Sequence, residues 1–167
     1  MKVLKPVYFI MIVCIYAFSS CYSFKDVSIP PEVKTARVNY IENRASYVNP
    51  QLSPQLTDRI RQKINNQTRL TLVTTDEADY DIHGEIRNYS LSTAGISQQE
   101  AATNRLTVTV HIVFRNRLDE KANFEADVSR NFDFSASLGL QQAEAQQFDD
   151  ILKNLTDEIF NRIFSNW

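Results

Sequence analysis

The strongest constraint on the fold is an alternation of apolar and polar residues between Arg105 and Asn116 that breaks only at Val113. The apolar positions are Leu106, Val108, Val110, Ile112 and Phe114, and the intervening ones are Thr107, Thr109, His111, Val113 and Arg115. Successive side chains of a β-strand point to opposite sides of a sheet, so this period of two predicts a strand. One side is polar except at Val113, which predicts a sheet with one buried face and one wet face.

Four further segments are predicted to be strands. They cover residues 33–41, 70–73, 80–87 and 123–134. After the third of these the alternation slips at Asn88, because Tyr89 and Leu91 take over the apolar positions, and the slip predicts a β-bulge. The predicted connections are a loop over 42–51, an acidic turn over 74–79, the longest loop over 92–104 and a charged turn over 117–122.

Two stretches have helical periodicity. The first opens at Leu52-Ser53-Pro54, where we expect Ser53 to cap the helix and Pro54 to occupy its first position. Its apolar face consists of Leu56, Ile60 and Ile64. The second stretch runs from Gln141 to Trp167, and its apolar stripe consists of Phe148, Ile151, Leu152, Leu155, Ile159, Phe160 and Ile163. Trp167 is expected to pack at the end of this helix.

These elements predict an α+β fold of two layers. We expect both helices to pack on one face of a mixed, mostly antiparallel sheet of four or five strands. The other face would carry Thr, His, Arg, Asn, Asp and Glu side chains. Such a face either meets water or packs against a hydrophilic partner.

The segment from Met1 to Ser20 has the layout of a secretory signal, with a basic start and a short apolar core over 7–18. Twelve helical residues rise about 18 Å, against roughly 30 Å of bilayer hydrocarbon. The small residues before Cys21 resemble the lipobox of bacterial lipoproteins, which implies cleavage before Cys21 and acylation of that residue. Otherwise the segment is an ordinary signal and Cys21 is incidental. Residues 21–32 are then a tether, and 33–167 a single domain.

Composition excludes several classes of function. Without residues 1–20 the chain has 16 Lys and Arg against 20 Asp and Glu, a net charge of −4. The charges are interspersed, so no basic face for nucleic acid is predicted. The three glycines form no phosphate-binding loop, and Cys21 is the one cysteine outside the signal, which leaves no cysteine cluster for a metal. We therefore expect no cofactor.

No pattern of catalytic residues is evident. His83 and His111 are the only histidines, and both fall on wet faces of predicted strands, where we interpret them as surface residues. Asp76, Glu77, Asp79 and Asp81 do not have the spacing of a calcium loop, so we interpret them as a solvated turn. We expect a non-enzymatic protein with neither a catalytic nor a metal site.

Basic side chains recur around the central strands and the turn that follows. They are Arg87, Arg105, Arg115, Arg117 and Lys121. Arginine can hold a phosphate by two parallel hydrogen bonds, so these residues are candidate contacts for a phosphorylated lipid or a partner. The alternative interpretation is ordinary charge on a wet sheet face.

Short motifs along the chain resemble, in the same order, those of the LptE-like family of lipoproteins. They are Cys21-Tyr22-Ser23-Phe24, the segment 29–35, Asn43-Arg44-Ala45, Leu52-Ser53-Pro54, the segment 67–70, Gly84-Glu85-Ile86 with Tyr89, the segment 104–110, Ile159-Phe160-Asn161 and Ser165-Asn166-Trp167.

The resemblance implies a fold of two helices on a four-stranded sheet and no catalytic activity. It implies a lipoprotein of the outer membrane, facing the periplasm, that plugs the LptD β-barrel during lipopolysaccharide assembly. Lipopolysaccharide itself is a candidate second partner, and whether it is bound directly stays open. The single acid in Tyr22-Ser23-Phe24-Lys25-Asp26 favours the periplasmic side over surface display. Two alternatives remain open: a free-standing periplasmic lipoprotein that binds a small ligand or glycan, and a secreted hydrolase.

Overall fold

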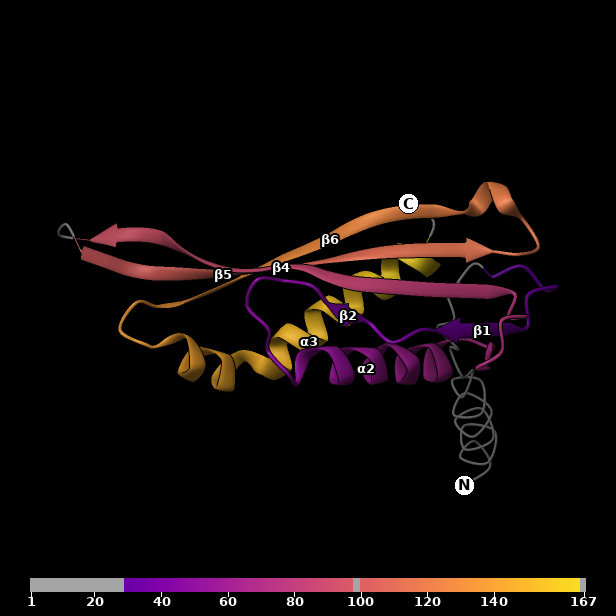
Figure 1. Cartoon of the computed structure of the whole chain (residues 1–167), viewed down its shortest axis with the longest axis horizontal. Helices are drawn as coiled ribbons and strands as arrows, with labels where there is room; N and C mark the ends of the chain where they lie inside the picture. The colour runs from indigo at the N-terminus through magenta and orange to yellow at the C-terminus, as the bar shows by residue number, and fades with distance from the viewer. Residues whose placement is uncertain (1–28, 98–99, 166–167) are drawn as a thin grey trace, which may run out of the picture.

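The computed structural model describes residues 29–97 and 100–165, and in this part of the chain six strands form one sheet beside two α-helices (Figure 1). The elements in order are β1 (Thr35–Val38), β2 (Glu42–Asn43), α2 (Leu52–Gln67), β3 (Thr71–Leu72), β4 (Tyr80–Ser97), β5 (Glu100–Asn116), the 3₁₀ turn η1 (Glu120–Ala122), β6 (Phe124–Ser135) and α3 (Leu140–Phe164). Residues 1–28, with the predicted signal and Cys21, and residues 166–167 lie outside the described part.

The sheet is mixed, with the strand order β3-β1-β4-β5-β6 and β2 paired to β4. β1 runs parallel to both β3 and β4, and α2 makes the crossover between β1 and β3. β4, β5 and β6 form an antiparallel meander. The predicted α+β class is confirmed. The sheet exceeds the predicted size by one strand because the two-residue β2 lies in a segment expected to be a loop.

Both helices lie on the same side of the sheet (Figure 1). The apolar side chains of α2, α3 and this side of the sheet form one hydrophobic cluster. Its fully buried members include Leu56 and Ile60 from α2, and Leu152, Leu155 and Ile159 from α3. Each helix therefore turns its predicted stripe to the sheet, although Phe148 and Ile163 of α3 are only partly buried. The sheet is covered on one face, the helix-covered face.

The predicted loop over 92–104 is wrong. β4 continues to Ser97 and β5 starts at Glu100, so the two strands form a long hairpin that extends past the helix layer (Figure 1). Neither side of this hairpin end is covered by a helix, and residues 91–94 are all exposed. The alternation that marks a half-buried strand is absent there because neither face needs to be apolar. The predicted bulge is confirmed, because the pairing register shifts between Ile86 and Asn88.

The start of α2 differs from the prediction. The helix begins at Leu52 after Gln51, and no side chain caps it. Ser53 is buried instead, and its hydroxyl has no hydrogen-bond partner. The buried Thr57 hydroxyl donates to the Ser53 carbonyl (2.8 Å) and accepts the Ile41 backbone N–H (3.0 Å). This bond ties α2 to the chain that follows β1.

The predicted solvated turn over Asp76–Asp81 is corrected at two of its carboxylates. Asp79 accepts the backbone N–H groups of Lys34 (2.8 Å) and Thr35 (2.9 Å), and these hydrogen bonds lower its pKa. Asp81 is paired with Arg37 across the β1–β4 contact. Both carboxylates fasten β1 to β4 over a sequence separation of 44 residues. Periodicity along one strand does not report such a pairing.

The two ends of the domain differ. Ile29, Leu118 and Ser165 lie around one hollow, at what we call the entry end, because the described chain begins there. The tip of the β4–β5 hairpin lies at the opposite end (Figure 1). Among the described residues, neither helix is long and apolar enough to cross a membrane.

Candidate partner surface

The side of β4, β5 and β6 that faces away from the helices is the open face of the sheet. Side chains of β5 and β6 pair across it in a ladder of polar contacts. The pairs are Arg105–Asp133, Thr107–Asn131, Thr109–Ser129, His111–Asp127 and Arg115–Glu125. The open face exists because the strands alternate in polarity and both helices lie on the other side.

The ladder is held by good hydrogen-bond geometry over most of its length. Arg105 donates to both carboxylate oxygens of Asp133, at 2.6 and 2.8 Å. The Thr107 hydroxyl lies 2.9 Å from the Asn131 side-chain oxygen, and the next two rungs measure 3.0 and 2.7 Å. These polar groups are satisfied by one another. The surface is therefore hydrophilic and ordered, and its charges are largely matched.

The structure spreads three of the five candidate basic residues along the open face instead of gathering them. Arg105 and Arg115 lie ten residues apart on β5, about 33 Å at the rise of a strand. Arg87 lies on β4 between these levels and donates to Glu85 at 2.5 Å. Arg115 is 3.6 Å from Glu125. Each of the three thus has a carboxylate neighbour, so they do not form one phosphate pocket.

The other two candidates lie beyond the open face, in the connection between β5 and β6. Arg117 donates weakly to the Asp76 backbone carbonyl, at 3.4 Å. Lys121 is part of η1, where its backbone N–H donates to the Asp119 side chain at 3.1 Å. These two residues are near the entry end, far along β5 from Arg105. Contact of any of the five with lipid or partner stays a prediction.

A second polar network lies where β1 meets β4. Asp81 accepts from Arg37 Nε and Nη2, both at 2.8 Å, and from Asn39 at 2.7 Å. His83 Nε2 lies 2.8 Å from Asp81 Oδ2, the same oxygen that accepts from Arg37 Nη2. Burial alone would raise the pKa of Asp81, but the hydrogen bonds from Arg37 and His83 outweigh it and lower the pKa to about 2. Sequence reasoning missed this site because its partners come from two strands far apart in the chain.

A shallow hollow of about 340 Å³ interrupts the open face between β2 and β5. It is lined by Tyr40, Arg44, Glu85 and His111, among others. Tyr40 is 55% exposed and is the one large apolar ring at this rim. The predicted surface histidines both lie on this face, although the His111 side chain is only 12% exposed because Asp127 and Glu125 flank it.

One buried carboxylate on the helix side of the sheet was also not predicted from the sequence. Glu144 of α3 is 7% exposed and accepts hydrogen bonds from the hydroxyls of Tyr89 and Tyr47. The two tyrosine rings stack with centroids 5.3 Å apart. Burial, together with the nearby Glu144, raises the pKa of Tyr89. A signal existed in the sequence, because Glu144 lies four residues before Phe148 and extends the apolar stripe of α3.

The open face presents hydrogen-bonding side chains that are held in place by one another. Among the described residues, no three His, Cys, Asp or Glu side chains lie close enough to hold a metal ion. Each histidine contacts carboxylates, and neither contacts a hydroxyl or thiol nucleophile that the structure describes. The geometry therefore supplies hydrogen-bonding groups along a strand face.

Solved structures show the same fold at low sequence identity. A hypothetical protein of Chlamydia trachomatis aligns with a TM-score of 0.53 and 7% identity, covering 80% of this chain and 99% of that one. A protein of Xanthomonas campestris gives 0.52 and 14%, covering 82% and 87%. A minor lipoprotein of Acinetobacter baumannii gives 0.50 and 14%, covering 80% and 92%. Fold and surface together define a two-layer α+β domain with an open, polar sheet face.

The family is also established. The sequence model of the LptE family, described as lipopolysaccharide-assembly, matches residues 33–163, which is most of the chain. The chain therefore belongs to the LptE lipopolysaccharide-assembly family, and the resemblance inferred from its motifs is confirmed. No protein with a curated description matches this chain in sequence.

Proposed function

We propose that this protein is a non-enzymatic, lipid-anchored component of outer-membrane assembly that fills an LptD-type β-barrel and directs its open sheet face to the barrel wall. The observation that carries the proposal is the polar ladder on that face, together with membership in the LptE family. The interior of a large membrane β-barrel is polar and wet. A hydrophilic sheet face with matched charges suits such a lumen, whereas an apolar face would not.

The proposed anchor is acylated Cys21 on the periplasmic side. The described chain starts at Ile29, eight residues after Cys21, so an extended tether spans at most about 28 Å. Such a tether holds the entry end near the membrane surface and leaves the hairpin tip at the far end. Cys21→Ser is expected to leave the fold intact and abolish acylation. Normal membrane retention of this variant would show that the barrel, and not the lipid, anchors the protein.

Co-purification tests the partner. The full-length protein is extracted from outer membranes in mild detergent, and its companions are identified by mass spectrometry. We expect a large β-barrel in stoichiometric amount. A Thr109→Arg variant places a bulky cation in the middle of the open face and is expected to reduce barrel recovery strongly. Asn66→Arg, at an exposed position of α2, is the matched control and should leave recovery unchanged.

Recovery of no barrel with the unmodified protein, or equal losses with both variants, would contradict the proposed role of the open face. Lipopolysaccharide in the purified complex would support it as a second partner. The basic residues Arg87, Arg105, Arg115, Arg117 and Lys121 stay candidate contacts for its phosphates. Because three of them already face carboxylates, we expect single neutral substitutions among Arg87, Arg105 and Arg115 to have small effects.

A free-standing lipoprotein that binds a small ligand or glycan is the second candidate. Of the two features that motivate this candidate, the polar sheet face remains, whereas the predicted long loop over 92–104 is replaced by the hairpin. A hollow of about 530 Å³ between Tyr47, Glu144 and Phe148 now favours it instead. Native mass spectrometry of the protein extracted from membranes separates the two candidates. This candidate predicts a bound small molecule and no barrel.

A further inference from the structure

The far half of β4 is an edge of the sheet. β1 and β2 pair with β4 up to Ile86, and beyond that residue the described part of β4 pairs with β5 alone. The hairpin extends past the helix layer there, and residues 90–94 are all exposed (Figure 1). An edge strand turns the backbone N–H and C=O groups of every second residue outward. Residues 90–94, which we call the free β4 edge, therefore offer backbone hydrogen bonds to another strand.

The edge at the other side of the sheet, β6, is protected. Side chains of α3 contact this strand: Gln147 donates to the Asp133 backbone carbonyl at 3.1 Å, and Glu158 pairs with Arg130. Charged side chains along an edge also disfavour pairing with a further strand. Those of β6 are Glu125, Asp127, Arg130 and Asp133.

β1 is protected where its neighbour β3 ends. Arg61 of α2 donates to the Val38 backbone carbonyl from Nη2 at 2.8 Å and from Nε at 3.3 Å. The guanidinium thus satisfies a group that another strand would otherwise bind. The free β4 edge differs, because residues 90–94 include neither a charged residue nor a proline. Among the described residues, no hydrogen bond from outside the β4–β5 hairpin reaches their backbone.

An apolar ladder across three strands ends at this edge. Leu91 lies opposite Leu106, and Leu106 lies opposite Phe132. Phe132 and Leu106 are only 9% and 2% exposed, whereas Leu91 is 47% exposed. Residues directly opposite each other share one face of the sheet, so the position that would cover Leu91 is the next one outward. An apolar side chain on an added strand would occupy that position.

We infer that the free β4 edge binds an extended, uncharged segment of the partner that packs on the open face, and that this segment joins the sheet as a further strand. Its side chains should alternate, with an apolar one beside Leu91 and polar ones beside Ser90 and Ser92. The latter two lie opposite Thr107 and Arg105, on the open face. The inference rests on the proposed function, under which the segment belongs to the β-barrel.

A second copy of this chain suits the edge less well. Two free β4 edges paired with each other would share about five residues, or about 17 Å of strand. Such a pair buries well under the roughly 1,200–2,000 Å² of a stable interface. A partner that also covers the open face gains the missing area, because that face continues from the same strand. The described chain begins at Ile29, at the opposite end of the domain (Figure 1).

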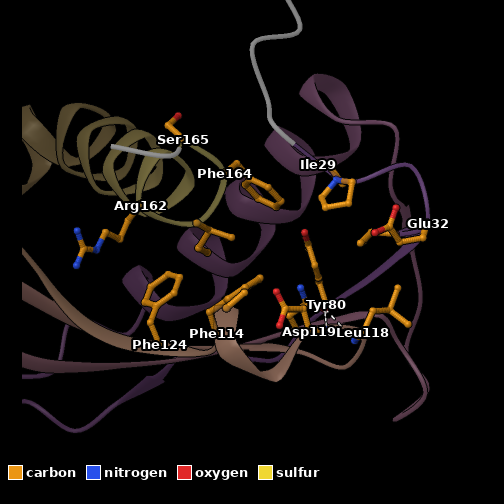
Figure 2. A pocket seen from close by; sticks show the side chains of 15 residues that line it. Ile29, Glu32, Tyr80, Phe114, Leu118, Asp119, Phe124, Arg162, Phe164 and Ser165 are labelled. Atoms are coloured by element: carbon orange, nitrogen blue, oxygen red, sulfur yellow. Dashed lines mark hydrogen bonds between the residues drawn. The ribbon is translucent and has the colours of Figure 1, made fainter.

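A charge on the free β4 edge tests the inference. Leu91→Lys adds a cation of the kind that blocks edge pairing, and the fold should be kept because Leu91 is half exposed. We expect recovery of the barrel from outer membranes to fall several-fold. Leu118→Lys is the matched control, because Leu118 is 53% exposed on the rim of the hollow at the entry end (Figure 2). Unchanged recovery with Leu91→Lys, or an equal loss with both variants, would overturn the inference.

Hydrogen exchange of the purified complex tests the backbone pairing itself. The outward amides of residues 90–94 should exchange several-fold more slowly in the complex than in the mature chain carrying Cys21→Ser alone. Unchanged exchange in a complex that contains the barrel would overturn the inference and leave the proposed function standing. Recovery of no barrel with the unmodified protein would contradict both. Exchange that slows in the chain alone as its concentration rises would assign the edge to a second copy and overturn the inference.

Discussion

The two faces of the meander β4-β5-β6 are built from the same strands but hold different kinds of interaction. On β5 the helix-covered face presents Val108, Val110 and Ile112, all fully buried in the hydrophobic cluster. The intervening residues Thr109 and His111 lie on the open face and pair with polar side chains of β6. A single strand therefore contributes to the core with every second residue and to the surface with the others.

Under the proposed function, this difference assigns stability to the helix-covered face and partner recognition to the open face. Burying apolar side chains contributes about 25 cal/mol per Å² removed from water, whereas exposed polar pairs contribute little to the free energy of unfolding. Substitutions on the helix-covered face should therefore reduce stability, and substitutions on the open face should reduce partner binding. The predictions below test that separation, from the largest expected change in stability to the smallest.

The largest loss is expected for Ile112→Ala on the helix-covered face. The side chain is fully buried, so the substitution removes apolar contacts and leaves a cavity in the cluster. We expect the free energy of unfolding to fall by about 2–5 kcal/mol. Urea denaturation of the full mature chain carrying Cys21→Ser measures this change. A loss below about 0.5 kcal/mol would contradict the position of the core.

Gly84→Val tests how closely the chain passes over the same face. A Cβ at position 84 would lie 3.1 Å from Ile41 Cγ1 and 3.2 Å from Ile112 Cδ1. The branched side chain therefore overpacks the space between β4 and the segment after β1. We expect a loss of about 1–3 kcal/mol in urea denaturation. Gly139→Val is the control, because a Cβ there meets no atom within 4 Å.

Asp81 sharpens the comparison, because it is the place where the open face contributes to stability. Its pKa in the folded protein is about 2, below the ordinary value of 3.8. The ionised carboxylate therefore stabilises the fold at every pH above about 4. The contribution is lost as pH falls from about 4 through 2 and amounts to about 2 kcal/mol. Urea denaturation between pH 5 and pH 2 should show a shallower decline for Asp81→Asn. An unchanged decline would mean that other carboxylates carry the effect.

The smallest change in stability is expected for Thr109→Ala on the open face. The Thr109 hydroxyl exchanges a hydrogen bond with Ser129 at 3.0 Å, and both can bond to water instead. The free energy of unfolding should change by no more than about 0.5 kcal/mol in urea denaturation. A loss comparable to that of Ile112→Ala would show that the two faces do not divide stability and recognition as described.

Periodicity within single segments predicted most of the fold. A half-buried helix or strand needs apolar side chains on its buried face only, so the period of those side chains reports burial directly. The examples are Leu56, Ile60 and Ile64 in α2, and Leu152 and Leu155 in α3. The same reasoning failed at 92–104. At positions 92–94 of that hairpin the side chains are exposed and lie beyond the helices, so burial imposes no period on them.

The candidate surface was predicted in kind but not in its contacts. The polar side of β5 indicated a hydrophilic face. The sequence spacing of Arg105 and Asp133, or of Arg37 and Asp81, carries no information about pairing until the strand register is known. Glu144 could have been found, because a carboxylate on an apolar stripe requires hydrogen-bond donors nearby. Its donors, Tyr89 and Tyr47, come from segments that only the fold brings together.

Site-specific crosslinking tests the central claim most directly. A photoreactive residue is placed at position 109 on the open face or, in a second protein, at position 66 on the exposed side of α2, and each is irradiated in intact cells. The account predicts a crosslinked product with a large outer-membrane β-barrel from position 109, in clear excess over position 66. A barrel product from position 66 with none from position 109 would contradict it.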